Sequence, residues 1–457
     1  MLRDDAQDET STQVFHPSSA GWLRRPLCIV VNLDCEKALY GLLVSLAVLS
    51  RLWGLGQRIL SHDETVHAQW SWYLYQGRGY SHHPLSHGPF LFHTTALSFY
   101  LFGDNEFAAR LVPAILGIVL VALPYTLRRW LGRSGALVAS CLFLISPSLL
   151  YYSRYARNDV PIIVWSLIAV LAIFRYLEQG RSHEGATERL RWLVVLAAAL
   201  SLMFATKEVS FFYIAILGSY LVFVFFARVG APRSNTLARK HWGRILLTTV
   251  GLIVVIVLAT GLLLFSLGLV GLFPFHYRDC GQAPVPDSVS GKIGCTEGDC
   301  SLIHGRCQRL IPVVAGDGII EFNETGARIA VRLTRLQMLV VVAMIGAISV
   351  ATAGGTHAVL KGLMPFQGGE RPALDLILFI GSFTLPFLSH VAISGLSRVA
   401  SRSLFGIDVA FNSLDYSEAG LLRSAGFVCI LLSISVTVGI WWDPRRWLVA
   451  GGVFYGI

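Results

Sequence analysis

The chain has 457 residues, of which 54% are hydrophobic and only 14% are charged. Soluble domains carry roughly a quarter charged residues, so this composition excludes an ordinary soluble enzyme and predicts a membrane protein. The formal net charge of +9 would also suit a nucleic-acid-binding protein. The basic residues, however, lie in short connections between apolar runs rather than along one face, and this distribution favours a role in membrane topology.

The order of polar and apolar segments predicts an all-α, polytopic integral membrane protein. Residues 1–36 are polar and unpatterned, and we expect a disordered tail without a cleaved signal peptide. About ten apolar runs follow, several of them near the ~20 residues that cross a bilayer. We expect these runs to be helical, because lipid offers no hydrogen-bond partner to an exposed backbone N–H or C=O group. The runs cover 37–56, 108–127, 135–151, 159–177, 190–206, 209–227, 245–273, 336–356, 373–393 and 422–442.

The basic residues assign a side to each connection. Arginine and lysine cluster after every second run, which predicts a cytoplasmic N-terminus and five external segments: 57–107, 152–158, 207–208, 274–335 and 394–421. We therefore divide the chain into a transmembrane core at 37–273, an external loop at 274–335 and C-terminal helices at 336–457. Only about eleven residues follow Arg446, too few to cross a bilayer, so we expect the chain to stop inside a further helix, the eleventh.

The first external segment concentrates titratable groups. Residues 58–93, "RILSHDETVHAQWSWYLYQGRGYSHHPLSHGPFLFH", contain six of the thirteen histidines. The zinc-protease pattern H-E-x-x-H does not fit, because His62 and His67 are five positions apart, roughly 140° around a helix. A helix that begins at Ser61 would bring Asp63, Glu64 and His67 together, as possible ligands of Mg, Mn, Ca or Zn. The alternative is a solvated first helical turn capped by Ser61.

Three cations fall at predicted external helix ends, where positive charge is least expected. Arg154, Arg157 and Lys207 would suit an anionic phosphate at the membrane surface. The alternatives are that the two arginines only extend to the interface, and that Lys207 only pairs with Glu208. Its place between two apolar runs still marks Lys207 as a functional candidate.

Several polar residues are expected to cap helices. Asn158 and Asp159 precede Val160-Pro161 at the start of the fourth run, a typical helix N-terminus. Asp104, Asn105 and Glu106 stand in the same relation to the second run. Arg110, which follows them, is expected to face either a cavity or a lipid headgroup.

The cysteines of the 274–335 loop form an even set. Cys280, Cys295, Cys300 and Cys307 in an oxidising compartment favour two disulfides, with three pairings open. A zinc knuckle is the alternative, but paired C-x₂₋₄-C units are absent.

Five segments in this order resemble one family of membrane enzymes. The acidic pair after the first run, "HHPLSHGPFLFH", "FGDNEFAARLVPAILG", "SPSLLYYSRYARNDVPIIVW" and "ATKEVSFF" are similar to the C-type (GT-C) membrane glycosyltransferases. Within these, the sequence is most similar to the protein O-mannosyltransferase and aminoarabinose-transferase group, and in that group to the branch called flippase-activity-associated proteins. The resemblance covers roughly residues 37–230.

The resemblance implies a function and places residues in it. In that family a polyprenyl-phosphate-linked sugar is the donor, and the acidic residue of the first loop acts as base or metal anchor, which maps to Asp63 and next to Glu64. It also implies that His87 lies near the donor phosphate and that Asp159 helps to bind metal or substrate. We therefore expect sugar transfer to a protein or glycan acceptor at the extracytoplasmic face of the cell membrane. The alternative is a non-catalytic, lipid-linked-sugar-binding or flippase-associated accessory protein.

Overall fold

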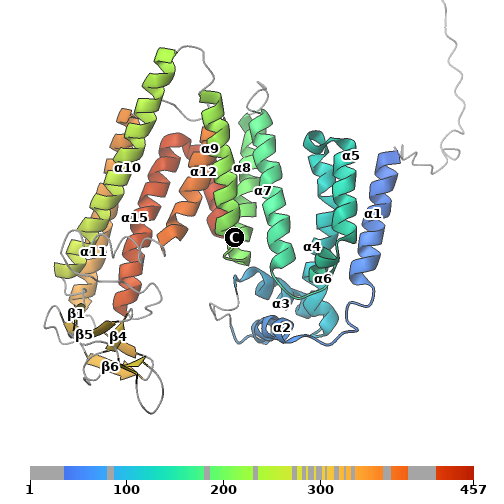
Figure 1. Cartoon of the computed structure of the whole chain (residues 1–457), viewed down its shortest axis with the longest axis horizontal. Coiled ribbons are helices and arrows are strands. Elements are labelled where there is room, and N and C mark those ends of the chain that lie inside the picture. The colour runs from blue at the N-terminus through green and yellow to red at the C-terminus, as the bar shows by residue number, and fades with distance from the viewer. Residues whose placement is uncertain are drawn as a thin grey trace, which may run out of the picture.

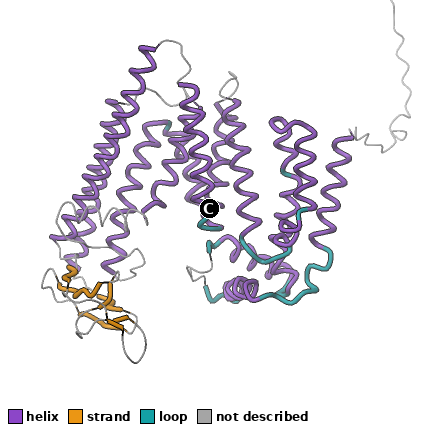
Figure 2. The backbone as a smooth tube through the Cα atoms, in the orientation of Figure 1, coloured by secondary structure: helices purple, strands orange, loops and turns teal. Residues whose placement is uncertain are grey.

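The computed structural model describes residues 35–79, 87–179, 186–229, 235–269, 335–363, 372–389 and 418–457, together with short strands between 275 and 330. Its membrane part is helical (Figures 1 and 2). Within the described ranges, seven helical stretches are long and apolar enough to cross a membrane. The predicted all-α, polytopic class is confirmed for the membrane part.

The helices follow the predicted runs closely, with added short helices near one end of the bundle. Their bounds are α1 Cys35–Leu52, α2 His62–Tyr75, α3 Phe90–Phe102, α4 Glu106–Ala122, α5 Pro124–Ile145, α6 Pro147–Ser153, α7 Asp159–Gln179, α8 Ala186–Thr206, α9 Ser210–Val229, α10 Asn235–Leu269, α11 Arg335–Leu363, α12 Pro372–Thr384, the 3₁₀ turn η2 Leu385–Leu388, α15 Glu418–Trp442 and α16 Pro444–Gly456.

Pro147 divides the predicted run at 135–151, and Gly132 breaks the helix just before that run, in a way that hydrophobicity does not reveal. Pro147 starts the separate helix α6, and the Ser146 hydroxyl accepts a hydrogen bond from the Leu149 N–H at 3.5 Å. Proline is favoured at the first position of a helix because its missing N–H has no partner there. Gly132 has φ +74° inside α5, so the chain turns sharply there, which an L side chain would resist.

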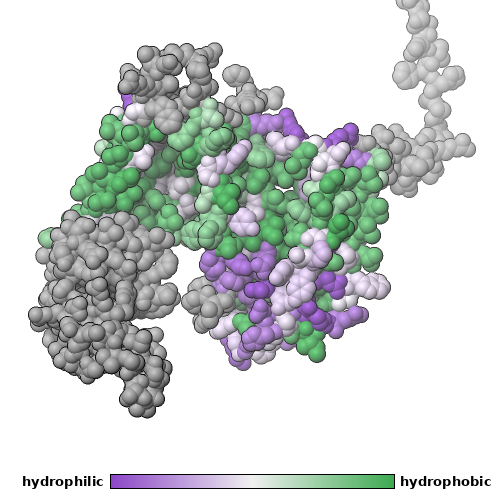
Figure 3. Space-filling view, in the orientation of Figure 1, coloured by the Kyte–Doolittle hydropathy of each residue, from purple (hydrophilic) through white to green (hydrophobic). Residues whose placement is uncertain are grey.

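The short helices and the described parts of the predicted external segments lie at one end of the bundle (Figure 1). Helices α2, α3 and α6 gather at this end, and α2 runs across the direction of the long helices. The strands lie at the same end, whereas the start of α1 and the turn within α5 lie at the other. Figure 3 shows a hydrophobic middle zone with hydrophilic residues at its two ends. The structure therefore groups the segments predicted to share one side of the membrane.

The 274–335 loop contains short antiparallel strands, which were not predicted from the sequence. β1 Phe275–Asp279, β5 Arg306–Pro312 and β4 Ser301–Ile303 form one sheet in that order; β2 Val285–Pro286 pairs with β3 Ile293–Gly294, and β6 Ile319–Asn323 with β7 Gly326–Ala330. Cys307 stands opposite Leu302 in the β4–β5 register. Cys280, Cys295 and Cys300 lie outside the described residues, so the disulfides stay a prediction.

Two large apolar clusters hold the long helices from α7 onward together. One joins α7, α8, α9, α12 and α16, and the other joins α10, α11 and α15. The C-terminal helix α16 packs through buried Trp447, Ala450 and Phe454, and the Ser201 hydroxyl of α8 donates to the Phe454 carbonyl at 2.7 Å. The residues after Arg446 thus form a helix that is packed against the core.

Candidate active site

Helix α2 begins at His62, directly after Ser61, as predicted. The adjacent residues Asp63 and Glu64 nevertheless face different surroundings. The side chain of Glu64 is fully buried, whereas that of Asp63 is 52% exposed. Successive helical residues are about 100° apart, so neighbours in sequence do not share a face. The prediction that Asp63, Glu64 and His67 converge on one point is therefore wrong for Glu64.

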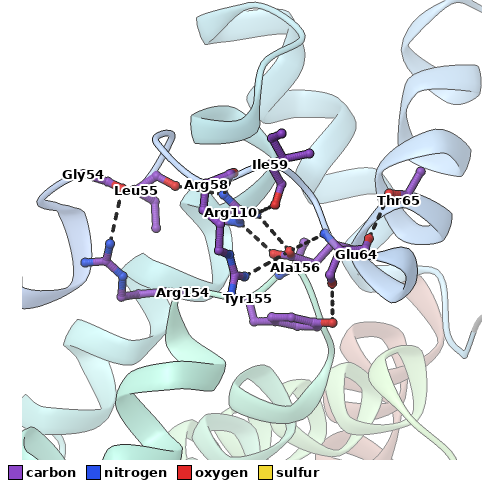
Figure 4. A network of polar contacts seen from close by, with 11 residues as sticks. Gly54, Leu55, Arg58, Ile59, Glu64, Thr65, Arg110, Arg154, Tyr155 and Ala156 are labelled. Carbon is purple, nitrogen blue, oxygen red and sulfur yellow. Dashed lines mark hydrogen bonds and ion pairs between the residues drawn. The ribbon is translucent and has the colours of Figure 1, made fainter.

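Glu64 is the centre of a buried polar network (Figure 4). Its Oε1 accepts from Arg110 Nε at 2.7 Å and from the Ala156 N–H at 3.1 Å. Its Oε2 accepts from Arg110 Nη2 at 2.9 Å, Arg58 Nη2 at 3.1 Å and the Ser61 N–H at 3.0 Å. Burial alone would raise the pKa of Glu64, but the bonds from Arg110 and the two N–H groups lower it to about 2. The Glu64 carboxylate is therefore ionised, and both of its oxygens accept hydrogen bonds from protein groups.

Arg110 links this carboxylate to the loop after α1. Its side chain is 1% exposed, and its Nη1 donates to the carbonyls of Leu55 at 3.1 Å and Arg58 at 2.7 Å. Helix α4 positions it, and the Asn105 side chain caps that helix by accepting from the Ala108 N–H at 2.9 Å. The predicted cap at Asn105 is confirmed. Arg110 also lines a concavity of about 350 Å³ with Arg58 and Arg154, so the expectation that it faces a cavity is confirmed, although its charge is paired with Glu64.

Arg154 donates its hydrogen bonds to backbone carbonyls at the end of α1. Its Nη1 donates to the Ser50 carbonyl at 2.7 Å. Its Nη2 donates to the Gly54 carbonyl at 3.3 Å (Figure 4). These carbonyls lie at the C-terminal end of α1, where backbone acceptors lack helical partners and a cation is favourable. Arg154 is thus directed to the end of α1, although it is only three residues from Arg157.

A chain of ion pairs joins the other predicted site residues. Arg157 Nη1 lies 3.3 Å from Asp63 Oδ2, and Arg157 Nε lies 3.5 Å from Asp159 Oδ2. Lys207 Nζ donates to Asp159 Oδ1 at 2.7 Å, and its side chain is only 16% exposed. Asp63 lies in α2, Arg157 in the loop before α7, Asp159 at the first position of α7, and Lys207 directly after α8. The structure therefore brings together four residues that are up to 144 positions apart in the chain.

His87 lies beside this ion-pair chain in a strained backbone position. Its φ of +66° is in the left-handed region, and its Nδ1 lies 2.9 Å from Glu208 Oε2. The next residue, Gly88, donates its N–H to the Thr206 carbonyl at 3.2 Å. A Cβ on Gly88 would meet the Ala205 carbonyl oxygen at 2.1 Å, so only glycine fits here. His87 and Glu208 are thus held against the end of α8, and Glu208 pairs with His87 while Lys207 pairs with Asp159.

His67 stacks on His87 inside the protein. The ring centroids are 6.2 Å apart, and Phe92 lies 5.7 Å from the His67 ring. His67 is 6% exposed. Burial, followed by the nearby His87 and Arg157, lowers the pKa of His67 to about 4, so the ring is neutral at physiological pH.

Two buried polar groups at the site have no hydrogen-bond partner among the described residues: His67 Nδ1 and both side-chain atoms of Asn158. Asn158 is 1% exposed and lies between Arg157 and Asp159 in the chain. Buried polar groups are nearly always paired, so these atoms are available to a ligand or to water. The predicted capping role of the Asn158 side chain is wrong, and the Asp159 carboxylate is used in the ion pair with Lys207.

The predicted metal ligands do not form one set. Both oxygens of Glu64 are taken up by Arg110 and its neighbours, so this carboxylate does not fit a metal ligand. Within the part of the chain that the structure describes, no three His, Cys, Asp or Glu side chains are grouped to hold a metal ion. A divalent cation at Asp63 and His67 stays a prediction.

The sequence did contain a signal for the role of Glu64. The buried residues of α2 are Glu64, His67, Ala68 and Ser71, which follow the i, i+3, i+4, i+7 spacing of one helix face. A buried glutamate at the head of such a face requires a cationic partner, and Arg110 fills this role.

Fold and site together define a polytopic helical membrane protein with an ion-pair chain at one end of its bundle. Comparison with known proteins gives the class of its relatives. The family model of dolichyl-phosphate-mannose-protein mannosyltransferases matches residues 57–268. Protein O-mannosyl-transferase 1 of Homo sapiens is 28% identical over 218 residues, which are 43% of this chain and 29% of the human protein. Its Mus musculus counterpart is 25% identical over 217 residues, again 43% of this chain and 29% of the relative.

Two solved structures are also similar. ArnT from Cupriavidus metallidurans, bound to undecaprenyl phosphate, shares 20% identity over 42% of this chain and 36% of its own, with a TM-score of 0.36. The S. cerevisiae Pmt1–Pmt2 complex, bound to the sugar donor, shares 21% identity over 45% and 30%, with a TM-score of 0.34. The chain spans less than a third of the length of the curated relatives. The resemblance to the protein O-mannosyltransferase group is confirmed, and its matched region contains the whole candidate site.

Proposed function

We propose that this chain is a C-type membrane glycosyltransferase that uses a polyprenyl-phosphate-linked sugar. The observation that carries the proposal is the meeting of Asp63, Arg157, Asp159 and Lys207 within the region matched by the mannosyltransferase family. The sequence similarity supplies the donor class, and the ion-pair chain supplies side chains suited to that donor.

Arg157 and Lys207 are assigned to the donor phosphate. The bond to Asp159 uses one of the three N–H donors of the Lys207 ammonium. The Arg157 guanidinium contacts two carboxylates only at 3.3 and 3.5 Å, longer than charge-assisted hydrogen bonds of about 2.7–2.9 Å. Both cations can therefore contact an incoming phosphate while Asp159 holds them in place. His87 lies beside them and can add a further donor.

Asp63 is assigned as the base. An acceptor hydroxyl or amine attacks the anomeric carbon, the bond from that carbon to the phosphate oxygen breaks, and its electron pair leaves with the phosphate. The acceptor proton passes to the Asp63 carboxylate, which also offsets the positive charge that develops on the sugar. The phosphate departs as a stable anion beside Arg157 and Lys207, so no carboxylic acid is required for the leaving group. Glu64 is assigned to hold α2 in place.

The site is placed at the extracytoplasmic face, with the N-terminus in the cytoplasm, on the basis of the distribution of arginine and lysine. Ile59 is 83% exposed at the site end. A single cysteine introduced there should react with a membrane-impermeant maleimide on intact cells. If that cysteine does not react, the site lies on the cytoplasmic side and the proposed orientation is wrong.

The proposal is tested with purified protein in lipid and labelled polyprenyl-phosphate mannose. We expect transfer to an added acceptor or slow donor hydrolysis by the wild type. Arg157→Ala and Lys207→Ala should each weaken donor binding by about tenfold or more, because each removes a charge-assisted contact of roughly 1.5–3 kcal/mol. Arg445→Ala is the control, since this exposed arginine lies outside the site.

Three outcomes distinguish a glycosyltransferase from a non-catalytic accessory protein. Donor binding and turnover that both depend on Arg157 and Lys207 support the transferase. Donor binding without any turnover would favour the accessory protein that binds lipid-linked sugars. Unchanged donor affinity in both variants would remove these residues from the phosphate site.

A further inference from the structure

The end of the bundle opposite the candidate active site has a basic pocket. Three helices form this concavity of about 820 Å³, namely α1 at its start, α5 around its turn and α7 near its end. Figure 1 shows these helix ends on the side away from α2 and α3. Its charged lining residues are Glu36, Lys37, Arg128, Arg129, Arg133 and Arg175.

The arginines of the pocket are held in defined positions. Arg128 lies over the Tyr125 ring, 4.2 Å from its centroid, and its Nη1 is 3.5 Å from Glu36 Oε1. Arg133 Nε donates to Glu36 Oε2 at 2.6 Å, and Arg129 Nη2 lies 2.7 Å from Glu178 Oε1. A single carboxylate thus orients two guanidinium groups. The guanidinium of Arg128 has five N–H donors, and its contact with Glu36 uses only one of them.

Arg175 supplies an unused donor. Its guanidinium lies between Trp130 and Trp192, 5.2 and 5.7 Å from their ring centroids. Its Nε is buried and has no hydrogen-bond partner within the described ranges. Aromatic faces stabilise the charge of an arginine but do not satisfy its N–H groups. A ligand oxygen would satisfy this donor.

The pocket is strongly positive and adjoins lipid-facing surface. Five of its lining side chains are basic and one is acidic. Apolar side chains beside it are exposed, such as Leu39 at 40% and Leu131 at 51%. The positive-inside rule alone explains basic residues at this end, but it does not require them to converge from three helices on one concavity.

We propose that this pocket binds the phosphate headgroup of an anionic membrane phospholipid. Guanidinium groups recognise phosphate oxygens through paired hydrogen bonds, and basic pockets between helix ends suit anionic headgroups. The exposed leucines lie where the acyl chains of such a lipid would run. A bound lipid would join α1 and α5 to α7, whose other end carries Asp159.

The test titrates short-chain phosphatidylglycerol into the detergent-solubilised full chain and follows its unfolding temperature. Phosphatidylcholine and inorganic phosphate are the comparison probes. We expect phosphatidylglycerol to raise the unfolding temperature of the wild type. Arg128→Gln/Arg133→Gln should need about ten- to thirtyfold more lipid, because each arginine near the surface contributes on the order of 1 kcal/mol.

Two further variants keep the result interpretable. Arg244→Gln removes an exposed arginine outside the pocket and should respond as the wild type does. Arg175→Lys keeps the charge but loses the planar guanidinium, and we expect a several-fold loss of lipid response. Equal responses of all variants, or an equal effect of phosphatidylcholine, would overturn the proposal. An inorganic phosphate effect as large as that of the lipid would assign the pocket to free phosphate instead.

Discussion

At the scale of the residue, the adjacent carboxylates Asp63 and Glu64 have different roles because one is half-exposed and the other is buried. Glu64 accepts from Arg110 and from two backbone N–H groups, so it connects α2 to α4 and to the loop before α7. Asp63 keeps a carboxylate at the surface beside Arg157. A substitution at each position should therefore affect a different property.

Glu64→Gln is expected to lower stability rather than chemistry. The amide replaces a charge that Arg110 requires, and breaking a buried pair by removing one partner costs about 3–5 kcal/mol. The unfolding temperature in lipid or detergent should fall by several degrees, and Glu64→Gln/Arg110→Gln should recover part of the loss. Asp63→Asn is the control and should unfold as the wild type does. An unchanged melting curve for Glu64→Gln would show that the network is not structural.

The buried His67 predicts a dependence of stability on pH. Its folded pKa of about 4 lies below its unfolded value near 6.5. Above 6.5 both states are neutral; as the pH falls from 6.5 to 4 the unfolded state alone binds the proton, so stability decreases by at most about 3 kcal/mol. In His67→Gln this decrease should be absent from melting curves recorded across that range. If His67→Gln kept the wild-type dependence of stability on pH, a group other than His67 would be responsible for it.

At the scale of the element, the site depends on how closely the loop before α3 lies on the end of α8. Gly88→Ala would place a Cβ against the Ala205 carbonyl and move His87 away from Glu208 and His67. We expect a weaker donor affinity, by about tenfold, and a lower unfolding temperature, since small displacements at a site have large effects. Gly218→Ala in α9, which meets no atom within 4 Å, is the matched control. Equal donor affinity in the two variants would argue against a role for this contact.

The elements were largely predictable, and the pairing of side chains between them was not. Ser61 and Asn105 are typical capping residues, so the starts of α2 and α4 follow from local sequence. Pro147 shows why hydropathy alone misplaced a helix boundary, because a proline restarts a helix without changing the apolar character of the run. The partnership of Glu64 with Arg110 joins positions 46 residues apart, and no local pattern specifies such a pair.

At the scale of the whole molecule, the two ends of the bundle have different chemistry. One end carries paired carboxylates and cations from α2, α7 and α8, and the other carries an excess of arginine around α1, α5 and α7. Clustering of arginine and lysine predicted this polarity from the sequence. The site geometry was predicted only in part: Asp63, Arg157, Asp159 and Lys207 meet, whereas Arg154 and Glu64 are used to hold the surrounding helices.

The central claim is that Asp63 takes the acceptor proton while other residues hold the donor. The most direct test compares wild type and Asp63→Asn for single-turnover sugar transfer from a polyprenyl-phosphate donor and, in parallel, for donor binding. We expect a loss of transfer of at least about a hundredfold, the lower range for removal of a general base, with donor affinity within a few-fold of wild type. Full transfer activity in Asp63→Asn would contradict it.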